Sequence, residues 1–181
     1  MKVAQTKLPG VYVISPDKKE DERGFFARAW DREELQRFGM NPEIGVQANI
    51  GYNKRKATLR GLHYQDSPFE EAKLVRCICG AAFDVALDLR PKSPTFGKWE
   101  GVELTGDNRR MLYIPEGCAH GYMTLLDDSE IFYPVSAPYS PAHERGVRWD
   151  DPKFAIDWPM SKGLVISQKD QSWPDFREHA S

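Results

Sequence analysis

Two histidines in strand-like runs carry the clearest chemical signal in this sequence. His63 lies in "ATLRGLHYQ" (57–65) and His120 lies in "IPEGCAHGY" (114–122). An imidazole titrates near neutral pH, so it can act as a general base. A base that removes a proton from carbon needs an acid on the opposite face of the substrate and a group that holds the negative charge formed between them.

The sequence offers candidates for each of these roles around His63. Two carboxylates could orient its imidazole, Asp170 in "SQKDQSW" and Asp84 in "FDVALDLR". Lys73 begins the run "KLVRCICG" and could stabilise a developing oxyanion. Tyr133 in "EIFYPV" could be the acid. Residue types alone leave the choice between the two carboxylates open.

A metal site is the alternative use of the two histidines. The P-x-G-x-x-H motif that ends at His120 is similar to the second half-motif of the cupin jelly rolls. Metal-binding cupins carry H-x-H and then a glutamate in the first half-motif, whereas here Gln65 replaces the second histidine. His63 and His120 with Glu70 or Glu71 fall short of the usual three-nitrogen ligand set. The sequence therefore favours a site without metal.

An anion site is the third possibility, because guanidinium forks suit phosphate. Arg23, Arg60 and Lys73 are the candidate cations. Strict alternation along a strand would place Arg60 and His63 on opposite faces. Gly61 between them permits a bulge that would bring both side chains to one face.

The composition predicts one soluble domain that spans residues 1–181. The chain is 40% hydrophobic and has a net charge of −2, so it lacks the basic surplus expected of nucleic-acid or membrane-surface proteins. We find no leader-like or membrane-spanning apolar run, and the three cysteines are expected to be free thiols. These features predict a cytoplasmic protein.

Short strands with turn signals dominate the chain between residues 46 and 147. The clearest is "FDVALDLR" (83–90), which alternates strictly and which we expect to form a hairpin with 73–79 after a turn at Gly80. Further strands are predicted at 11–15, 24–30, 46–53, 57–65, 98–105, 109–115, 119–125 and 129–136.

About ten strands at short spacing predict an all-β sandwich or jelly-roll barrel. The helix signal is strongest at 31–39, with Asp31 as the N-cap and Gly39 as the stop. The C-terminal third is expected to wrap the barrel with short helices and loops.

Nine short motifs, in order and spacing, resemble the dTDP-4-dehydrorhamnose 3,5-epimerase family. The motifs are "DERGFF" (21–26), "QANIG" (47–51), "LRGLHYQ" (59–65), "KLVRC" (73–77), "DVALDLR" (84–90), "SPTFGKW" (93–99), "IPEGCAHGY" (114–122), "WDDP" (149–152) and "SQKD" (167–170). The resemblance implies a cupin-like jelly roll with short peripheral helices that works as a homodimer without metal or other cofactor. It also implies a role in dTDP-rhamnose and polysaccharide biosynthesis.

The resemblance further implies a reaction on a nucleotide-linked 4-keto-6-deoxy sugar, whose ketone acidifies the hydrogens on carbons 3 and 5. His63 would be the base, oriented by Asp170. Lys73 would stabilise the enolate, and Tyr133 would be the acid. The residues implied in substrate binding are Arg23, Phe26, Arg28, Gln47, Asn49, Arg60, His120 and Tyr139. Arg23 and Phe26 would serve the neighbouring subunit of the dimer.

Several positions depart from the family pattern, and all of them bear on ligand recognition. Arg28 stands where the family usually has a glutamate near the thymidine. Pro138 stands in place of the first member of an aromatic pair, so that only Tyr139 remains, and Pro134 replaces a lysine. The run "NIGYN" stands where the family usually has "NxSxS". The implied base, orienter, lysine and acid are all retained.

Other functions remain open at this point. A single-site epimerase at carbon 3 or 5, or a keto-isomerase of another nucleotide sugar, would use the same base. A metal-dependent cupin enzyme would need the metal ligands discussed above. A sugar-binding module without catalysis would not need an acid and a base, so the joint presence of His63, Asp170 and Tyr133 argues for an enzyme.

Overall fold

The computed structural model describes residues 1–177. Within that range the chain forms fourteen β-strands and two short α-helices. The strands are β1 (Lys2–Gln5), β2 (Tyr12–Ser15), β3 (Lys19–Asp21), β4 (Gly24–Phe26), β5 (Gln47–Asn53), β6 (Thr58–Gln65), β7 (Lys73–Cys79), β8 (Ala81–Asp88), β9 (Trp99–Thr105), β10 (Met111–Ile114), β11 (Cys118–Thr124), β12 (Ser129–Val135), β13 (Glu144–Gly146) and β14 (Val165–Ile166). The helices are α1 (Arg32–Gln36) and α2 (Gln168–Gln171). The predicted all-β class is confirmed.

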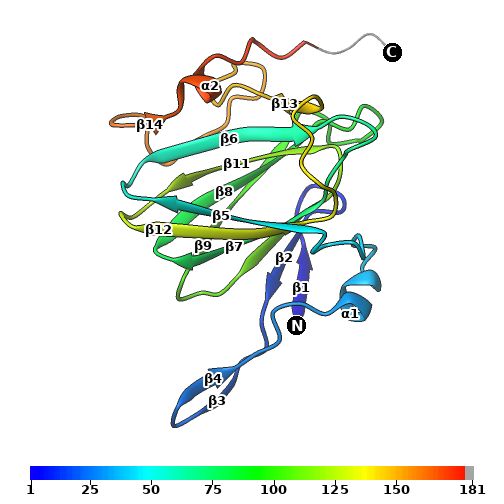
Figure 1. Ribbon diagram of the computed structural model, residues 1–181, viewed down its shortest axis with the longest axis vertical. Helices are drawn as coiled ribbons and strands as arrows, with labels where there is room; N and C mark the ends of the chain where they lie inside the picture. The colour runs from blue at the N-terminus through cyan, green and yellow to red at the C-terminus, as the bar shows by residue number, and fades with distance from the viewer. Residues whose placement is uncertain (178–181) are drawn as a thin grey trace.

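Two sheets face each other and form the body of the molecule (Figure 1). The first sheet has the order β1-β2-β10-β7-β12-β5. The second has the order β13-β6-β11-β8-β9, and β14 pairs with β6 in parallel. A third, two-stranded sheet is the hairpin β3–β4. Figure 1 shows this hairpin extending away from the two large sheets.

The core lies between the two large sheets, because alternating apolar residues from both point inward. Val75, Leu112 and Ile131 of the first sheet pack with Ala86 and Leu104 of the second, and all five are fully buried. Burying a side chain such as Leu or Ile stabilises the fold by about 1.5–3 kcal/mol. The core therefore fixes the spacing of the two sheets that carry the site.

The outer faces of the sheets are covered differently. The second sheet packs its outer face against residues between 147 and 176, through Phe154 and Trp158 among others. This confirms the prediction that the C-terminal third wraps the barrel. The first sheet is covered at its β2–β10 end by the segment around α1, through Leu35 and Met40.

The predicted hairpin of 73–79 with 83–90 is wrong. β7 pairs with β10 and β12 in one sheet, whereas β8 pairs with β9 and β11 in the other. The turn at Gly80 (φ +75°) carries the chain from one sheet to the other, and a Cβ there would lie 2.3 Å from Ser129 Oγ. Both faces of β8 are buried, including the face that carries Asp84 and Asp88. Alternation along a strand does not specify which strands it pairs with, so the local pattern could not distinguish a hairpin from a crossover.

The other predicted elements are present close to their expected positions, and two of them are clearly shorter than expected. Four short strands were not predicted: β1, β3, β13 and β14. The helix expected at 31–39 covers only Arg32–Gln36, although Asp31 is the N-cap as predicted and accepts a hydrogen bond from the Glu34 amide at 3.1 Å. The strand expected at 24–30 ends at Phe26. No helix in residues 1–177 is long and apolar enough to cross a membrane.

Candidate active site

Two adjoining hollows open between the two large sheets, and three residues line both of them: His63, His120 and Tyr133. His63 and His120 come from β6 and β11 of the second sheet, whereas Tyr133 comes from β12 of the first. Lys73 of β7 lines one hollow, and Arg60 and Asp170 line the other. A molecule held there would have the two histidines on one side and Lys73 and Tyr133 on the other.

His63 is paired with Asp170. Its Nε2 lies 2.7 Å from Asp170 Oδ1, and the Asp170 side chain is buried while that of His63 is one-third exposed. The Gly61 amide donates to the other carboxylate oxygen at 3.4 Å. Burial acts to raise the pKa of Asp170. The hydrogen bond to His63, the charge of His63 and the hydrogen bond from the Gly61 amide outweigh burial, so the pKa of Asp170 lies below its usual value. The carboxylate is thus anionic beside an imidazole that reaches solvent.

The helix α2 places this carboxylate. Ser167 is its N-cap and accepts a hydrogen bond from the Asp170 amide at 3.0 Å. β14, just before it, pairs with the start of β6. β14 and α2 therefore lie beside β6, the strand that carries His63, although they are far from it in the sequence.

A bulge at Gly61 brings Arg60 and His63 to the same side. Along β11, His120 pairs with His63 and Tyr122 pairs with Arg60, so two residue steps on β11 match three on β6. Gly61 has φ +108°, and a Cβ there would lie 2.6 Å from the His120 carbonyl oxygen. The bulge that the sequence permitted is therefore present, and only glycine fits it.

Asp84, the other candidate orienter of His63, pairs instead with His120. His120 Nε2 lies 3.0 Å from Asp84 Oδ2, and both side chains are buried. The second oxygen, Asp84 Oδ1, is buried and has no hydrogen-bond partner among residues 1–177. Two separate His–Asp pairs therefore stand side by side on the second sheet.

Lys73 and Tyr133 supply the facing wall. Lys73 Nζ is buried 2.7 Å from Glu71 Oε1, but in an orientation that does not form a hydrogen bond. The ammonium group thus retains its N–H donors. Burial, reinforced by Tyr122 and Glu71, raises the pKa of Tyr133 to about 12, so its phenol is protonated at neutral pH. Its ring meets that of His120 edge-on, with the centroids 5.8 Å apart.

The predicted binding residues Gln47, Asn49 and Tyr139 also line the hollow that contains Lys73. Gln47 Oε1 accepts a hydrogen bond from the Tyr139 amide at 2.9 Å. The Tyr139 hydroxyl donates to Glu144 at 2.7 Å, and Glu144 in turn is 2.6 Å from Lys169 Nζ. This chain of contacts joins the loop after β12 to α2, next to Asp170.

Arg60 is held by hydrogen bonds to uncharged groups, and it forms no ion pair with a carboxylate among residues 1–177. Its Nε donates to Asn53 Oδ1 at 2.8 Å and one terminal nitrogen donates to the Tyr52 carbonyl at 3.3 Å. Asn53 is buried and donates to the Gly51 and Ser129 carbonyls at 2.9 and 3.1 Å. The guanidinium keeps its positive charge uncompensated at the mouth of the hollow.

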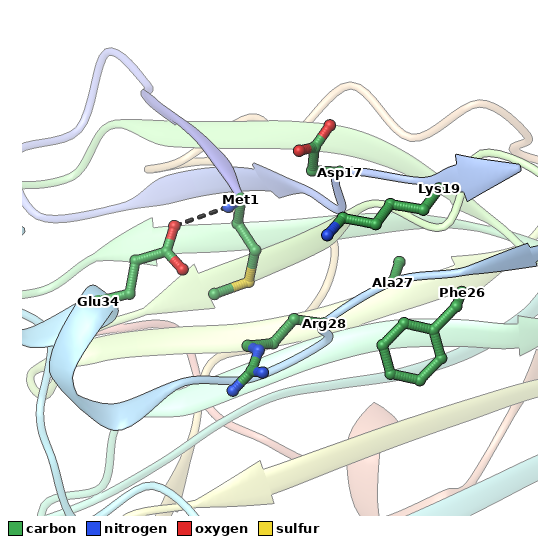
Figure 2. Close-up of a pocket in the computed structure, with 7 residues that line it drawn as sticks. All are labelled: Met1, Asp17, Lys19, Phe26, Ala27, Arg28 and Glu34. Atoms are coloured by element: carbon green, nitrogen blue, oxygen red, sulfur yellow. Dashed lines mark hydrogen bonds and ion pairs between the residues drawn. The ribbon is translucent and has the colours of Figure 1, made fainter.

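Three predicted binding residues lie elsewhere in this chain. Arg23, Phe26 and Arg28 belong to the β3–β4 hairpin and the segment that follows it, and none of them lines the hollows between the large sheets. Figure 2 shows Phe26 and Arg28 beside a different hollow near α1. Arg23 pairs with Asp21 at 2.6 Å and Arg28 with Asp31 at 3.1 Å.

Several lining residues were not singled out from the sequence. They are Tyr64, Tyr122, Glu144 and Lys169, together with Asn53 behind Arg60. A signal for Asn53 was present, because it shares the inward face of β5 with Gln47 and Asn49 at a spacing of two residues. The roles of Glu144 and Lys169 depend on contacts between distant segments.

The residues considered as metal ligands are engaged otherwise. Gln65 is buried, donates to the Phe69 and Pro138 carbonyls and accepts from the Ser140 amide, so it ties two loops together. Glu71 pairs with Lys73. Across residues 1–177 no group of three or more His, Cys, Asp or Glu side chains is arranged to hold a metal ion.

Comparisons with known proteins show which family this chain resembles. A family model described as dTDP-4-dehydrorhamnose 3,5-epimerase matches residues 5–178. The dTDP-4-dehydrorhamnose 3,5-epimerase of Sinorhizobium fredii is 44% identical over 182 residues, which cover 98% of this chain and 88% of that protein.

Solved structures of the same family are also similar to this chain. The dTDP-4-dehydrorhamnose 3,5-epimerase from Elizabethkingia anophelis NUHP1 has a TM-score of 0.93 at 38% identity, with 97% of this chain and 96% of that one covered. The dTDP-6-deoxy-D-glucose-3,5-epimerase from Legionella pneumophila, in complex with dTDP-4-keto-L-rhamnose, has a TM-score of 0.87 at 38% identity, with 93% and 89% covered. The predicted cupin-like jelly roll is confirmed by these neighbours.

Proposed function

Because the chain belongs to the dTDP-4-dehydrorhamnose 3,5-epimerase family of carbohydrate epimerases, we propose that it inverts carbons 3 and 5 of dTDP-4-dehydro-6-deoxyglucose on the way to dTDP-rhamnose. One observation carries the proposal. His63 on the second sheet is paired with Asp170 of α2, and Tyr133 and Lys73 line the hollows from the sheet that faces it. An epimerase needs a base and an acid on opposite faces of the sugar. The arrangement supports His63 as the base and Tyr133 as the acid.

In the proposed mechanism His63 removes a proton from the carbon next to the 4-ketone. The electron pair of the C–H bond moves onto the ketone oxygen and forms an enolate. Asp170 stabilises the imidazolium that results and holds the ring in place, in the way that a carboxylate supports a catalytic histidine. The 2.7 Å contact between them supports this role.

Lys73 stabilises the enolate, and Tyr133 completes the inversion. An ammonium group in a buried site interacts with a developing oxyanion far more strongly than it would in water. Tyr133 then donates its proton to the carbon from the face opposite to His63. Its pKa of about 12 keeps the proton on the phenol until the carbanionic enolate accepts it.

The diphosphate of the substrate is proposed to lie against Arg60, whose fork has no carboxylate partner of its own. We further propose that the enzyme is a homodimer in which the β3–β4 hairpin of one copy reaches the hollows of the other. Figure 1 shows the β3–β4 hairpin extending from the body of the molecule. Arg23 lies in the turn at its tip and Phe26 at the end of β4, and both side chains are exposed. That geometry supports delivery to a second copy, and Arg28 would follow in the same segment.

The test is deuterium incorporation, read by NMR in heavy water, with a panel of nucleotide-linked 4-keto-6-deoxy sugars. We expect deuterium at carbons 3 and 5 together with inverted product, and the strongest activity with the dTDP sugar. Incorporation at one carbon alone would identify a single-site epimerase. Failure of the enzyme to exchange either hydrogen above the rate of buffer, with any sugar of the panel, would contradict the proposed function.

A further inference from the structure

Tyr122 is a buried phenol beside Arg60 that has no role in the proposed mechanism. On the β6–β11 ladder His120 pairs with His63, and Tyr122 pairs with Arg60. Opposite residues of an antiparallel ladder place their side chains on the same face, and all four residues line the hollow that contains Asp170. The ladder therefore presents a histidine pair and an arginine–tyrosine pair to the hollow, about 7 Å apart along β11.

The hydroxyl hydrogen of Tyr122 has no acceptor among residues 1–177. The residue is only 4% exposed, and its one hydrogen bond comes from Asn53 Nδ2 at 3.4 Å. An amide nitrogen can only donate, so the phenol oxygen is the acceptor in this contact and its own hydrogen stays unused. A buried donor without an acceptor is unfavourable, so this phenol is suited to an acceptor that enters the hollow.

The hydroxyl keeps its proton at neutral pH. Burial raises the pKa of Tyr122, and this effect outweighs the Asn53 hydrogen bond and the charge of Arg60, which both lower that pKa. The nearby carboxylate of Asp84 raises it further. The phenol is therefore a neutral donor next to a guanidinium whose Nη1 also has no acceptor among residues 1–177.

Two residues of β5 hold the phenol and the guanidinium together. The side-chain oxygen of Asn53 accepts from Arg60 Nε at 2.8 Å, while its nitrogen contacts the Tyr122 hydroxyl. Gly51 leaves room for that hydroxyl, because a Cβ at Gly51 would lie 2.6 Å from the phenol oxygen. Gly51 and Asn53 stand at the two serine positions of the family pattern "NxSxS". Both departures of this chain therefore lead to the same place.

The arginine–tyrosine pair offers only donors to a ligand, and a phosphate offers only acceptors to it. We propose that Tyr122 is a further substrate-binding residue, whose hydroxyl donates a hydrogen bond to a diphosphate oxygen held by Arg60. This rests on the proposed function, which places the sugar between His63 and Tyr133 and the diphosphate at Arg60. The separation of the two pairs along β11 is one that a pyranose ring and its phosphate ester can span.

Calorimetric titration with dTDP tests the contact without any chemistry. Tyr122→Phe removes only the hydroxyl, and we expect it to bind dTDP about tenfold or more weakly than the native chain, because a hydrogen bond to a charged oxygen is lost. Tyr113→Phe is the matched control. Tyr113 is also buried, its hydroxyl accepts from the Asn41 amide at 2.8 Å, and it lines neither hollow. Native affinity in Tyr122→Phe, or an equal loss in the control, would overturn the proposal.

Steady-state rates with the dTDP-linked 4-keto sugar separate binding from proton transfer. A contact to the diphosphate is made equally in the ground state and the transition state, so Tyr122→Phe should raise KM about tenfold and leave kcat within about threefold. A lower kcat with an unchanged KM would place Tyr122 at the reacting carbons instead. A higher KM with unchanged dTDP affinity would assign the hydroxyl to a sugar oxygen, and either result overturns the diphosphate contact.

The close approach at Gly51 gives a second test that needs no ligand. Gly51→Ala should lower the free energy of unfolding in the native chain, because the added Cβ meets the Tyr122 oxygen. In the Tyr122→Phe background that oxygen is absent and the nearest ring carbon is 3.8 Å away, so the same substitution should cost less. Equal costs in both backgrounds, measured by urea unfolding, would show that the hydroxyl does not lie over Gly51.

Failure of the Tyr122 contact and failure of the proposed function give different results. If the native chain exchanges the sugar hydrogens but Tyr122→Phe binds dTDP normally, only the contact is wrong. If dTDP binding depends on Tyr122 but no hydrogen exchanges, only the function is wrong. A native chain that does not bind dTDP overturns the contact, and the exchange assay then decides the function. Should Tyr122→Phe fail to fold by circular dichroism, Gly51→Ala displaces the same hydroxyl, and unchanged dTDP affinity there would overturn the contact.

Discussion

His63 and Tyr133 stand on facing sheets, and both line the two hollows that open between those sheets. The base and the acid proposed for the reaction are therefore separated by the width of the hollow rather than being neighbours on one strand. A sugar ring between them would present one face to each.

Replacing His63 by Ala or Asn is expected to abolish epimerisation while binding of the nucleotide sugar survives. Loss of a general base costs about 10²–10⁴-fold in rate. Asp170→Asn should cost less, because the imidazole remains and loses only its orienting charge. Steady-state rates and calorimetric binding measure the two effects, and a His63→Ala enzyme with a nearly normal rate would show that another residue is the base.

Tyr133→Phe is expected to separate exchange from inversion. The base and Lys73 remain, so the substrate should still lose its proton and regain deuterium from the His63 side. The opposite face lacks a donor, so inverted product should form more slowly than deuterium enters with retained configuration. NMR in heavy water follows both processes together, and equal slowing of the two would assign Tyr133 to binding instead of proton transfer.

If the β3–β4 hairpin of one copy completes the site of the other, two inactive variants should complement each other in a mixed dimer. Arg23→Ala and His63→Ala should each be inactive as pure proteins. In a mixed dimer one site combines the intact His63 of one chain with the intact Arg23 of the other, so about a quarter of native activity should return after random exchange of subunits. No recovery, with exchange demonstrated by mass spectrometry, would place Arg23 in the site of its own chain or outside any site.

Gly61→Ala should damage both stability and activity. A Cβ at Gly61 would lie 2.6 Å from the His120 carbonyl oxygen and 2.7 Å from Gly121 Cα, so the bulge that aligns Arg60 with His63 would have to open. We expect a loss of at least about 2 kcal/mol in the free energy of unfolding. Gly45→Ala is the control, because Gly45 has a similar φ of +111° with no atom within 4 Å of the added Cβ. If urea unfolding gave the same loss for both variants, backbone strain alone would explain it.

Asp88 makes stability depend on pH at acid values. Burial acts to raise its pKa, but hydrogen bonds from Arg90, Ser93 and Thr95 overcome this and bring the pKa to about 2. In the unfolded chain the pKa of an aspartate is about 3.9, so the contribution to stability is fully present above that value and is lost as the pH falls to about 2. The lowered pKa corresponds to about 2–3 kcal/mol at neutral pH.

The measurement is the free energy of unfolding in urea for the native chain and for Asp88→Asn. The difference between them should shrink as the pH falls from about 4 towards about 2. Asp157→Asn, at an exposed position, is the control and should show no such trend. A difference that stays constant with pH would show that the carboxylate charge of Asp88 does not stabilise the fold.

The sequence by itself determined the longer strands, the residue types of the site and the family. Period-two alternation shows wherever one face of a strand is buried, which is why the positions of β5, β6, β8 and β12 could be read locally. The N-cap at Asp31 and the bulge permitted by Gly61 are also local, since each depends on the residue and its immediate neighbours. His63, Lys73 and Tyr133 were selected on the same basis, by their chemistry within apolar runs.

Only the tertiary structure decided which of these residues meet. Asp84 and Asp170 were equal candidates for His63 by residue type, and the choice depended on β14 and α2 returning to β6 while β8 came to lie beside β11. The turn at Gly80 carries the chain from β7 in one sheet to β8 in the other. The local pattern is the same for a hairpin and a crossover, so the sequence around Gly80 could not show this. Pairing between distant segments depends on how sheets stack and close, and no window of the sequence contains that information.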